Sequence, residues 1–212
     1  MLPCPAPDTC WLYLIRHGET ANNREKPPRL QGRRTDPALS PEGRRQAEQT
    51  ARFLSSAGLK KVFSSPLLRA RETAAAIATP LGLDVIAVDE LVEVDVGLWE
   101  GRNWTEIEKC NPEAYRAFME NAAENPYLGG ETVGAVLERS GPALERLLAE
   151  NVGSCIAAVA HNVVNRTWLG RLLGLPLSKY RSVPQDNCAV NLIRYRRGEV
   201  KAVTINGVFH LE

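Results

Sequence analysis

The sequence of 212 residues has little cysteine, little net charge and no long apolar run, and each shortage narrows the class of protein. Its five cysteines are an odd number without a C-x-x-C pair, so we expect neither a disulfide framework nor a zinc site, and a reducing, cytoplasmic location. The formal net charge of +1 creates no overall field that would attract nucleic acid or anionic lipid. No apolar run approaches the ~18 residues of a membrane span. Nucleic acid and membranes are therefore not expected among the partners.

The sequence does contain short apolar runs that alternate with helical segments. Four of these runs read as strands: 11–16, 60–65, 84–94 and 154–160. Helix start signals and helical spacing predict four helices: 41–58, 66–82, 131–150 and 163–174. Residues 187–205 read as a terminal hairpin. This alternation predicts a single α/β domain over residues 1–212 with a mostly parallel sheet, in which residues 1–10 form a loose extension.

Two segments have weaker patterns. Gly141 and Pro142 lie inside the third predicted helix, where a proline predicts a kink or a split. Residues 102–128 are helical in parts, but two prolines interrupt them, so we expect irregular structure there. Side chains of this segment could either grip a substrate or pack against each other: Trp104, Tyr115, Arg116, Phe118 and Tyr127.

Two of the three histidines directly follow buried strands. His17 comes after the run 11–16, and His161 comes after the run 154–160. In open α/β sheets ligands bind just beyond the carboxyl ends of the strands, so we expect both histidines at the same edge. A lone histidine there would be most simply a hydrogen-bonded core residue, but two at matching positions indicate a site. His210, close to the end, reads as a tail side chain.

Charged residues are predicted beside these histidines. Arg16 immediately precedes His17, and Ser65 is read as the cap of a helix whose first turn carries Arg69. Helix N-termini and guanidinium groups both bind anions. Glu93, at the end of the third predicted strand, is a candidate proton donor to a leaving oxygen. Other charges nearby read as solvated surface groups: Arg71, Asp95 and Glu100.

Five blocks of sequence, in order, resemble the histidine phosphatase superfamily, the phosphoglycerate mutase-like proteins, and its small phosphatase branch. The blocks are LIRHGET, SSPLLRARET, LVEVDVGLWEG, GGET and AVAHNVVNR, and they span roughly residues 11–194. The resemblance implies a mixed, mainly parallel sheet with helices on both faces. It also implies a phosphohistidine mechanism that uses no metal and no other cofactor, acts on a small phosphorylated substrate, and is compatible with a homodimer.

The resemblance also implies roles for individual residues. His17 resembles the nucleophile and Glu93 the general acid and base, while the phosphate pocket consists of Arg16, Arg69 and His161. The substrate-binding residues implied are Asn23, Gln31, Gly32 and Asn162, the last of which stands where the family usually has glycine. Because the attacking nitrogen must be unprotonated, the other ring nitrogen of His17 should donate to a backbone carbonyl, that of Gly18 or of a neighbour.

Three functions compete on this basis. The first is hydrolysis of a phosphomonoester such as a sugar, nucleoside or α-ribazole phosphate, the second is a cofactor-dependent phosphoglycerate mutase, and the third is a non-catalytic phosphoryl-binding or interaction module. Mutases of the family have a pattern similar to ERHYG around the acid, followed by a lysine about eleven residues later. In this sequence Val96 stands at the aromatic position and Trp104 at the lysine position, which favours hydrolysis. Retention of His17 and Glu93 argues against a non-catalytic module.

A second phosphatase pattern is rejected. Cys10 and Arg16 have the C-x5-R spacing of cysteine-dependent phosphatases, but that chemistry needs a turning loop of backbone N–H groups around the phosphate. The residues between them, Trp-Leu-Tyr-Leu-Ile, predict an extended strand instead. The spacing is therefore read as chance.

Overall fold

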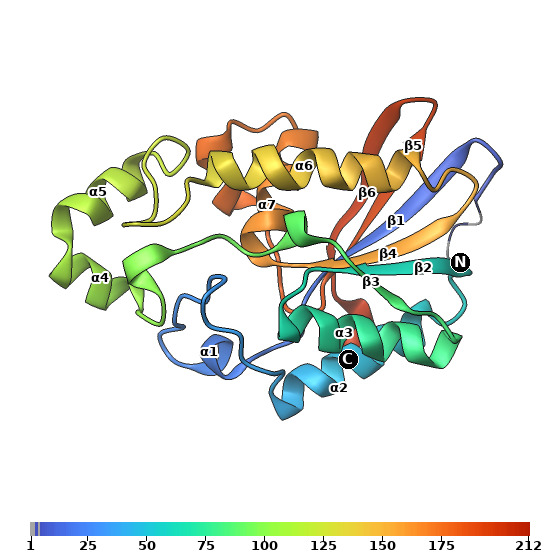
Figure 1. Cartoon of the computed structure of the whole chain (residues 1–212), viewed down its shortest axis with the longest axis horizontal. Coiled ribbons are helices and arrows are strands. Elements are labelled where there is room, and N and C mark those ends of the chain that lie inside the picture. The colour runs from blue at the N-terminus through green and yellow to red at the C-terminus, as the bar shows by residue number, and fades with distance from the viewer. Residues whose placement is uncertain (1–2, 4) are drawn as a thin grey trace.

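Two strands from opposite halves of the chain pair in parallel at the centre of one sheet, and the other four extend it on either side (Figure 1). The computed structural model describes residues 3 and 5–212. The sheet has the order β3-β2-β4-β1-β5-β6. Its strands are β1 (Thr9–Arg16), β2 (Leu59–Ser64), β3 (Val85–Ala87), β4 (Cys155–Ala160), β5 (Val190–Arg196) and β6 (Glu199–Gly207). Neighbours from β3 to β1 run parallel, whereas β5 is antiparallel to β1 and to β6.

Helices cover both faces of this sheet, as the resemblance implied. Helices α2 (Pro41–Leu54) and α3 (Leu68–Ala78) lie on one face, and α6 (Val133–Ala149) and α7 (Asn162–Leu172) lie on the other (Figure 1). The short helices α1 (Ala21–Arg24), α4 (Trp104–Cys110) and α5 (Pro112–Glu120) lie beyond the strand ends. Within the described residues, 3-10 turns complete the elements at 79–81, 89–91, 97–99, 177–182 and 209–211. In the described part of the chain, no helix has the length and apolar character that crossing a bilayer would require.

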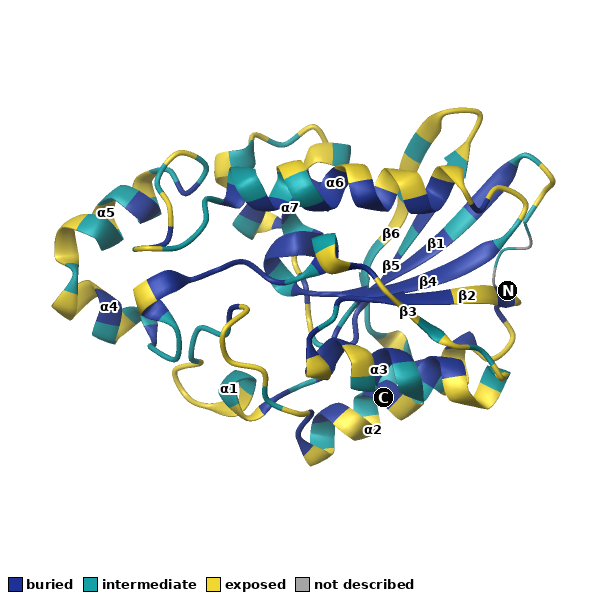
Figure 2. Cartoon of the chain, viewed as in Figure 1, coloured by how far each residue is buried: buried dark blue, intermediate teal, exposed yellow. Residues whose placement is uncertain are grey.

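Strand β1 shows how the sequence builds two cores. Because side chains of a strand alternate between faces, Leu12 and Leu14 join the cluster under α6 and α7, while Tyr13 and Ile15 join the cluster over α2 and α3. All four side chains are at most 1% exposed. Burial is concentrated on the central strands and on the helix surfaces that face them (Figure 2). The apolar run therefore occupies the middle of the sheet, and the polar residues that follow it lie at the carboxyl ends of the parallel strands.

The start of α2 matches its sequence signals. The Ser40 side chain accepts a hydrogen bond from the Gly43 amide at 3.0 Å, and Pro41 is the first helical residue. The helix ends at Leu54, short of the predicted limit at Gly58. Residues 55–58 instead connect the helix to β2, and Gly58 has φ of +66° there.

One prediction of secondary structure is wrong, and another is met in part. The run 84–94 is a strand only over Val85–Ala87, because β2 ends at Ser64, opposite Ala87, and offers no partner beyond it. Residues 102–128 are helical in parts, as predicted, with α4 and α5 separated at Asn111, but only residues 121–128 form an irregular stretch. Pro112 is the first residue of α5, a position where its missing N–H costs nothing.

Two further expectations are settled in detail. Helix α6 passes through Pro142 as one element, so the predicted split is absent. Strand β1 begins at Thr9, so the last two residues of the predicted extension belong to the sheet. Met1, Leu2 and Cys4 of that extension lie outside the described residues.

Candidate active site

The two histidines meet where β1 and β4 end side by side. Arg16 is the register partner of Ala160, and the His17 amide donates to the Ala160 carbonyl at 3.0 Å. The rings of His17 and His161 lie with their centroids 5.1 Å apart, and both residues are buried. The predicted convergence of these side chains is confirmed.

The His17 ring is held as a neutral imidazole with one defined tautomer. Its Nδ1 lies 2.8 Å from the Gly18 carbonyl oxygen, which can only accept, so Nδ1 carries the proton and Nε2 carries the lone pair. Burial lowers the pKa of His17 well below its ordinary value, and Arg69 and Arg16 lower it further. A Cβ at Gly18 would lie 2.6 Å from the Gly43 carbonyl oxygen, so the turn rests directly on the start of α2. This geometry suits a nitrogen nucleophile.

His161 occupies a different environment although its strand position matches. Its Nε2 lies 2.7 Å from the Ser65 hydroxyl, and its buried Nδ1 has no partner among the described residues. Burial lowers the pKa of His161 well below its ordinary value, with further lowering by Arg69 and His17. His161 is also the residue immediately before α7. The imidazole is therefore neutral and next to the first ring.

Arg16 and Arg69 differ in how much of their charge faces the cavity. Arg16 donates from Nη1 to the Gln185 carbonyl at 2.6 Å, and its buried Nε has no partner among the described residues. Arg69 is fully buried and donates to the carbonyls of Gly32 at 2.9 Å and Thr35 at 3.2 Å. Arg16 therefore keeps donor groups on the cavity that it lines, whereas Arg69 lies outside the lining and holds the adjacent loop.

The predicted cap of the helix that carries Arg69 is wrong. Helix α3 begins at Leu68, with Leu67 as its cap residue, and Ser65 precedes both. The Leu68 amide is occupied by the carboxylate of Asp36, at 2.8 and 2.9 Å. An acidic residue from another segment therefore satisfies this helix end, and the Ser65 hydroxyl is directed to His161 instead.

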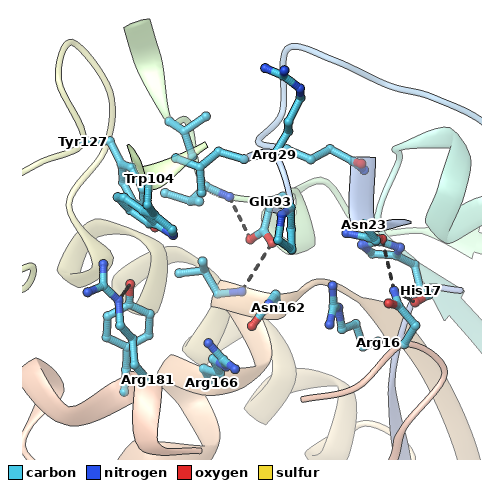
Figure 3. Close-up of a pocket in the computed structure, with 18 of the residues that line it drawn as sticks. Arg16, His17, Asn23, Arg29, Glu93, Trp104, Tyr127, Asn162, Arg166 and Arg181 are labelled. Atoms are coloured by element: carbon cyan, nitrogen blue, oxygen red, sulfur yellow. Dashed lines mark hydrogen bonds between the residues drawn. The ribbon is translucent and has the colours of Figure 1, made fainter. Parts of the chain in front are cut away.

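Glu93 is buried beside the histidines, with only 3% of its surface exposed. Its carboxylate oxygens accept from the amides of Val94 at 2.9 Å and Val163 at 3.3 Å (Figure 3). Burial raises the pKa of the Glu93 carboxyl above its ordinary value, against the lowering effect of these amides and of Arg69. A carboxyl that retains its proton more readily than in water is suited to donate it.

The segment that carries Glu93 is fixed by Arg139 of α6. The Arg139 guanidinium donates to the carbonyls of Glu90 and Val92 at 2.7 Å each, and to the Glu93 carbonyl at 3.2 Å. Glu131, the acid of the GGET block, pairs with Arg139 at 3.2 Å. Three backbone carbonyls on one guanidinium replace the strand pairing that this segment lacks.

Asp95 links the same segment to the loop over Arg69. The Asp95 amide donates to Glu131 at 2.8 Å, and its carboxylate pairs with Arg33 at 3.1 Å and Arg34 at 3.0 Å. Asp95 is only 7% exposed, so its interpretation as a surface acid is wrong. The loop that contains Gly32 is thereby tied to the residues beside the acid.

The four candidate substrate-binding residues are not placed alike. Asn23, Gln31 and Asn162 line a cavity with a volume of about 440 Å³, together with Arg16, His17 and Glu93. Gly32 is buried and does not belong to the lining: its amide donates to Glu100 at 2.7 Å and its carbonyl accepts from Arg69. A Cβ at this position would lie 2.6 Å from the Val94 carbonyl oxygen, so Gly32 permits the loop to approach.

Several cavity residues were not foreseen from the sequence, and they include Arg29, Arg166, Tyr180, Arg181 and Asn187. Asn187 donates to the His17 carbonyl at 3.0 Å and to Asn23 at 3.3 Å. Arg166 lies one helical turn after Asn162 on α7, a spacing that could have indicated it. Nothing in the local sequence indicates Arg181.

The residues of the segment 102–128 divide between the cavity and the core. Trp104 and Tyr127 line the cavity, whereas Phe118 is fully buried and packs against both rings. Tyr115 packs against Trp104, and Arg116 donates to a carbonyl of its own helix. Packing, one of the two uses suggested by the sequence, is therefore present, and two of the rings also line the cavity.

Neither a reactive cysteine nor a metal cluster accompanies this arrangement in the described residues. Burial raises the pKa of the Cys10 thiol to about 12, and Cys10 lies within β1, so the cysteine-phosphatase pattern is confirmed as chance. Over residues 3 and 5–212, no cluster of three or more histidine, cysteine, aspartate or glutamate side chains is arranged to hold a metal ion.

This arrangement of two imidazoles, arginines and a buried acid at the strand ends is that of a known family. The sequence model of the histidine phosphatase superfamily (branch 1) matches residues 12–207, and the chain belongs to this family.

Individual relatives carry different activities in their names. The chain is 34% identical to "Phosphoserine phosphatase 1" of Hydrogenobacter thermophilus over 94% of this chain and 93% of that protein. It is 31% identical to "Probable phosphoglycerate mutase GpmB" of Salmonella paratyphi A over 89% of this chain and 86% of that protein. Among solved structures, YhfR of Bacillus stearothermophilus superposes with a TM-score of 0.88 at 28% identity, covering 96% of this chain and 100% of that one.

Proposed function

We propose that the protein is a phosphatase that hydrolyses phosphomonoesters of small metabolites through a phosphohistidine intermediate on His17. One observation carries this proposal. The Nδ1 proton of His17 is held by the Gly18 carbonyl at 2.8 Å, so the Nε2 lone pair remains for attack in a cavity that Arg16 and Glu93 also line.

In the first step the Nε2 lone pair of His17 forms a bond to phosphorus while the phosphorus–oxygen bond to the leaving alcohol breaks. Phosphoryl transfer spreads negative charge over three equatorial oxygens. Arg16 lines the cavity and would stabilise this charge directly, whereas Arg69 and His161 lie near His17 but outside the lining and would support it from behind. Glu93 supplies the proton that the departing oxygen needs, which its raised pKa favours.

In the second step a water molecule replaces the alcohol. The Glu93 carboxylate, left without its proton, accepts one from this water as the water oxygen bonds to phosphorus. The phosphorus–nitrogen bond breaks, its electron pair returns to Nε2, and inorganic phosphate leaves. Glu93 regains its proton, so both residues are restored for the next cycle.

Hydrolysis is preferred over mutase activity because of two cavity residues. Val96 and Trp104 both line the cavity. They stand at the positions where the mutase pattern of the family has an aromatic residue and a lysine. The kinship with a protein named as a mutase keeps that activity as the second candidate. Conversion of 3-phosphoglycerate to its 2-isomer without net release of phosphate would decide for it.

The proposal is tested with p-nitrophenyl phosphate and a phosphoryl-labelled ester. We expect hydrolysis that persists in a chelator, and acid-labile label on the protein after rapid quenching. His17→Asn should lower turnover on the order of 10⁴-fold or more and abolish the label. His210→Asn, which changes the histidine bound to Thr50 at 3.0 Å, is the matched control and should retain both. Full activity of His17→Asn, or dependence on added magnesium, would contradict the proposal.

A further inference from the structure

The cavity carries more positive charge than one phosphoryl group requires. Its charged lining residues are four arginines and a single acid: Arg16, Arg29, Arg166, Arg181 and Glu93. Arg29 is compensated, because it forms ion pairs with Glu25 at 2.5 Å and Glu106 at 3.2 Å. Arg16 lies beside His17, where the phosphoryl group is transferred. Arg166 and Arg181 therefore remain without a role in binding the transferred phosphoryl group.

Arg166 has no partner of opposite charge. Its side chain forms no hydrogen bond or ion pair with any residue that the structure describes, and its Nε is buried without a partner. Burial lowers the pKa of the Arg166 guanidinium, and its neighbour Arg181 lowers it further. Arg166 is partly exposed, but a guanidinium with a buried, unpartnered nitrogen is costly. Such a cost is understandable where a ligand supplies the missing anion.

Arg181 is held in place by rings and not by a carboxylate. Its guanidinium carbon lies 4.9 Å from the centroid of Phe118, 5.2 Å from that of Trp104 and 5.6 Å from that of Tyr180. Its Nε donates to the Tyr180 hydroxyl at 3.2 Å, while one Nη is buried without a partner in the described chain. Ring faces attract the cation without neutralising it, so Arg181 stays available to an anion.

The two arginines lie together, away from the nucleophile. Figure 3 shows Arg181 at the opposite end of the cavity from His17, with Arg166 between Arg181 and Arg16. The charges agree with this order: the positive charge of Arg166 lowers the pKa of Arg16, and that of Arg181 lowers the pKa of Arg166. The volume of about 440 Å³ exceeds what a phosphoryl group alone would fill.

We propose that Arg166 and Arg181 form a second anion-binding subsite, so that the substrate is a small phosphomonoester carrying a further anionic group, a carboxylate or a second phosphoryl. This inference rests on the proposed phosphatase function and narrows its substrate class. The phosphoryl group that is transferred binds beside His17, and the second anion binds between the two guanidinium groups.

Matched pairs of esters test the subsite. Glycerol 3-phosphate and 3-phosphoglycerate differ by a carboxylate, and fructose 6-phosphate and fructose 1,6-bisphosphate differ by a phosphoryl group. In one pair, we expect the wild type to have a kcat/KM at least about tenfold higher for the ester that carries the additional anionic group. Such a preference is typical of charge-assisted hydrogen bonds. The pair that shows the preference identifies the anion. Arg166→Met and Arg181→Met should each reduce that preference about tenfold.

Two variants serve as controls. Arg166→Lys keeps the charge and should retain most of the preference. Arg171→Met removes one charge from the same helix, but Arg171 pairs with Glu145 outside this cavity, so the preference should stay unchanged. Circular dichroism of each variant verifies folding, and because Arg181 packs against three rings, Arg166→Met is the decisive substitution.

The outcomes separate the two proposals. Equal kcat/KM within both pairs, or a preference that survives in Arg166→Met and Arg181→Met, overturns the subsite and leaves the phosphatase intact. If the wild type hydrolyses neither p-nitrophenyl phosphate nor a single one of the four esters, the proposed phosphatase function is contradicted. Calorimetric titration with 3-phosphoglycerate and glycerol 3-phosphate then tests the subsite alone, and equal affinities for the two would overturn it.

Discussion

The two ends of the cavity are built by different means. At the end that contains His17 and Glu93, side chains are oriented by hydrogen bonds to backbone groups, including the Gly18 carbonyl and the amides of Val94 and Val163. At the far end, Trp104 and Arg181 are positioned by stacked rings. Backbone bonds from a sheet edge allow little movement, whereas ring packing can readjust. The comparison suggests that reactivity is set at the first end and substrate choice at the second.

The largest loss among variants that keep the nucleophile is expected from Glu93→Gln. Without the acid, kcat/KM for an alkyl phosphate should fall about 10²- to 10⁴-fold, the usual range for a general acid. The loss for p-nitrophenyl phosphate should be much smaller, because its leaving group departs without a proton. Steady-state kinetics on both esters measure this, with Glu90→Gln, a surface acid paired with Arg146, as control. Equal losses for both esters would remove Glu93 from the acid role.

The same variant should change the pH profile. Because burial raises the pKa of Glu93, wild-type kcat/KM for the alkyl ester should fall as pH rises through that value and the proton is lost. Because burial lowers the pKa of His17, kcat/KM at acid pH should fall only when pH drops through that lowered pKa and Nε2 becomes protonated. In Glu93→Gln the alkaline decline should be absent, while the acid side persists.

A smaller effect at the same end is expected from Arg139→Met. Arg139 does not line the cavity, but it holds three carbonyls of the segment that carries Glu93, so its removal should misplace the acid. We expect a loss of about tenfold for alkyl esters and less for p-nitrophenyl phosphate, the selective pattern of an impaired general acid. Arg139→Lys should restore part of the activity. Arg146→Met, on the same helix, is the control. A uniform loss on all esters would indicate general destabilisation instead.

The smallest effect is expected at the far end, from Trp104→Leu. Removing this ring releases one face of Arg181, so KM for the preferred substrate should rise about threefold to tenfold, in line with a cation–π contact. The change in kcat should be smaller than the change in KM, because the residues around His17 are untouched. Trp11→Leu, a tryptophan at the start of β1, is the matched control. A fall in kcat larger than the rise in KM would contradict the division between the two ends.

The reactive end could be predicted from the sequence because strands place their following residues by a simple rule. His17 and His161 each follow a buried apolar run, and parallel strands end at one edge, so their meeting needed no knowledge of side-chain packing. Arg69 and Glu93 were indicated by their places near a predicted helix start and a predicted strand end, and the blocks shared with the family implied their roles.

The remaining features depend on contacts between distant segments, which local patterns do not encode. Asp36 caps α3 from a loop far earlier in the chain, so Ser65 was wrongly read as the cap. Strand β3 stops where β2 stops, which its own apolar run over 84–94 could not reveal. Arg181 reaches the cavity only because rings from α4 and α5 receive it.

Strand β4 is synthesised late, yet it lies between β2 and β1, two strands of the first third of the chain. The centre of the sheet is therefore complete only when a segment from the second half of the chain pairs with both strands. Such non-local pairing slows folding, and return of catalysis after dilution from urea would require it, since β4 carries His161 to the end of β1.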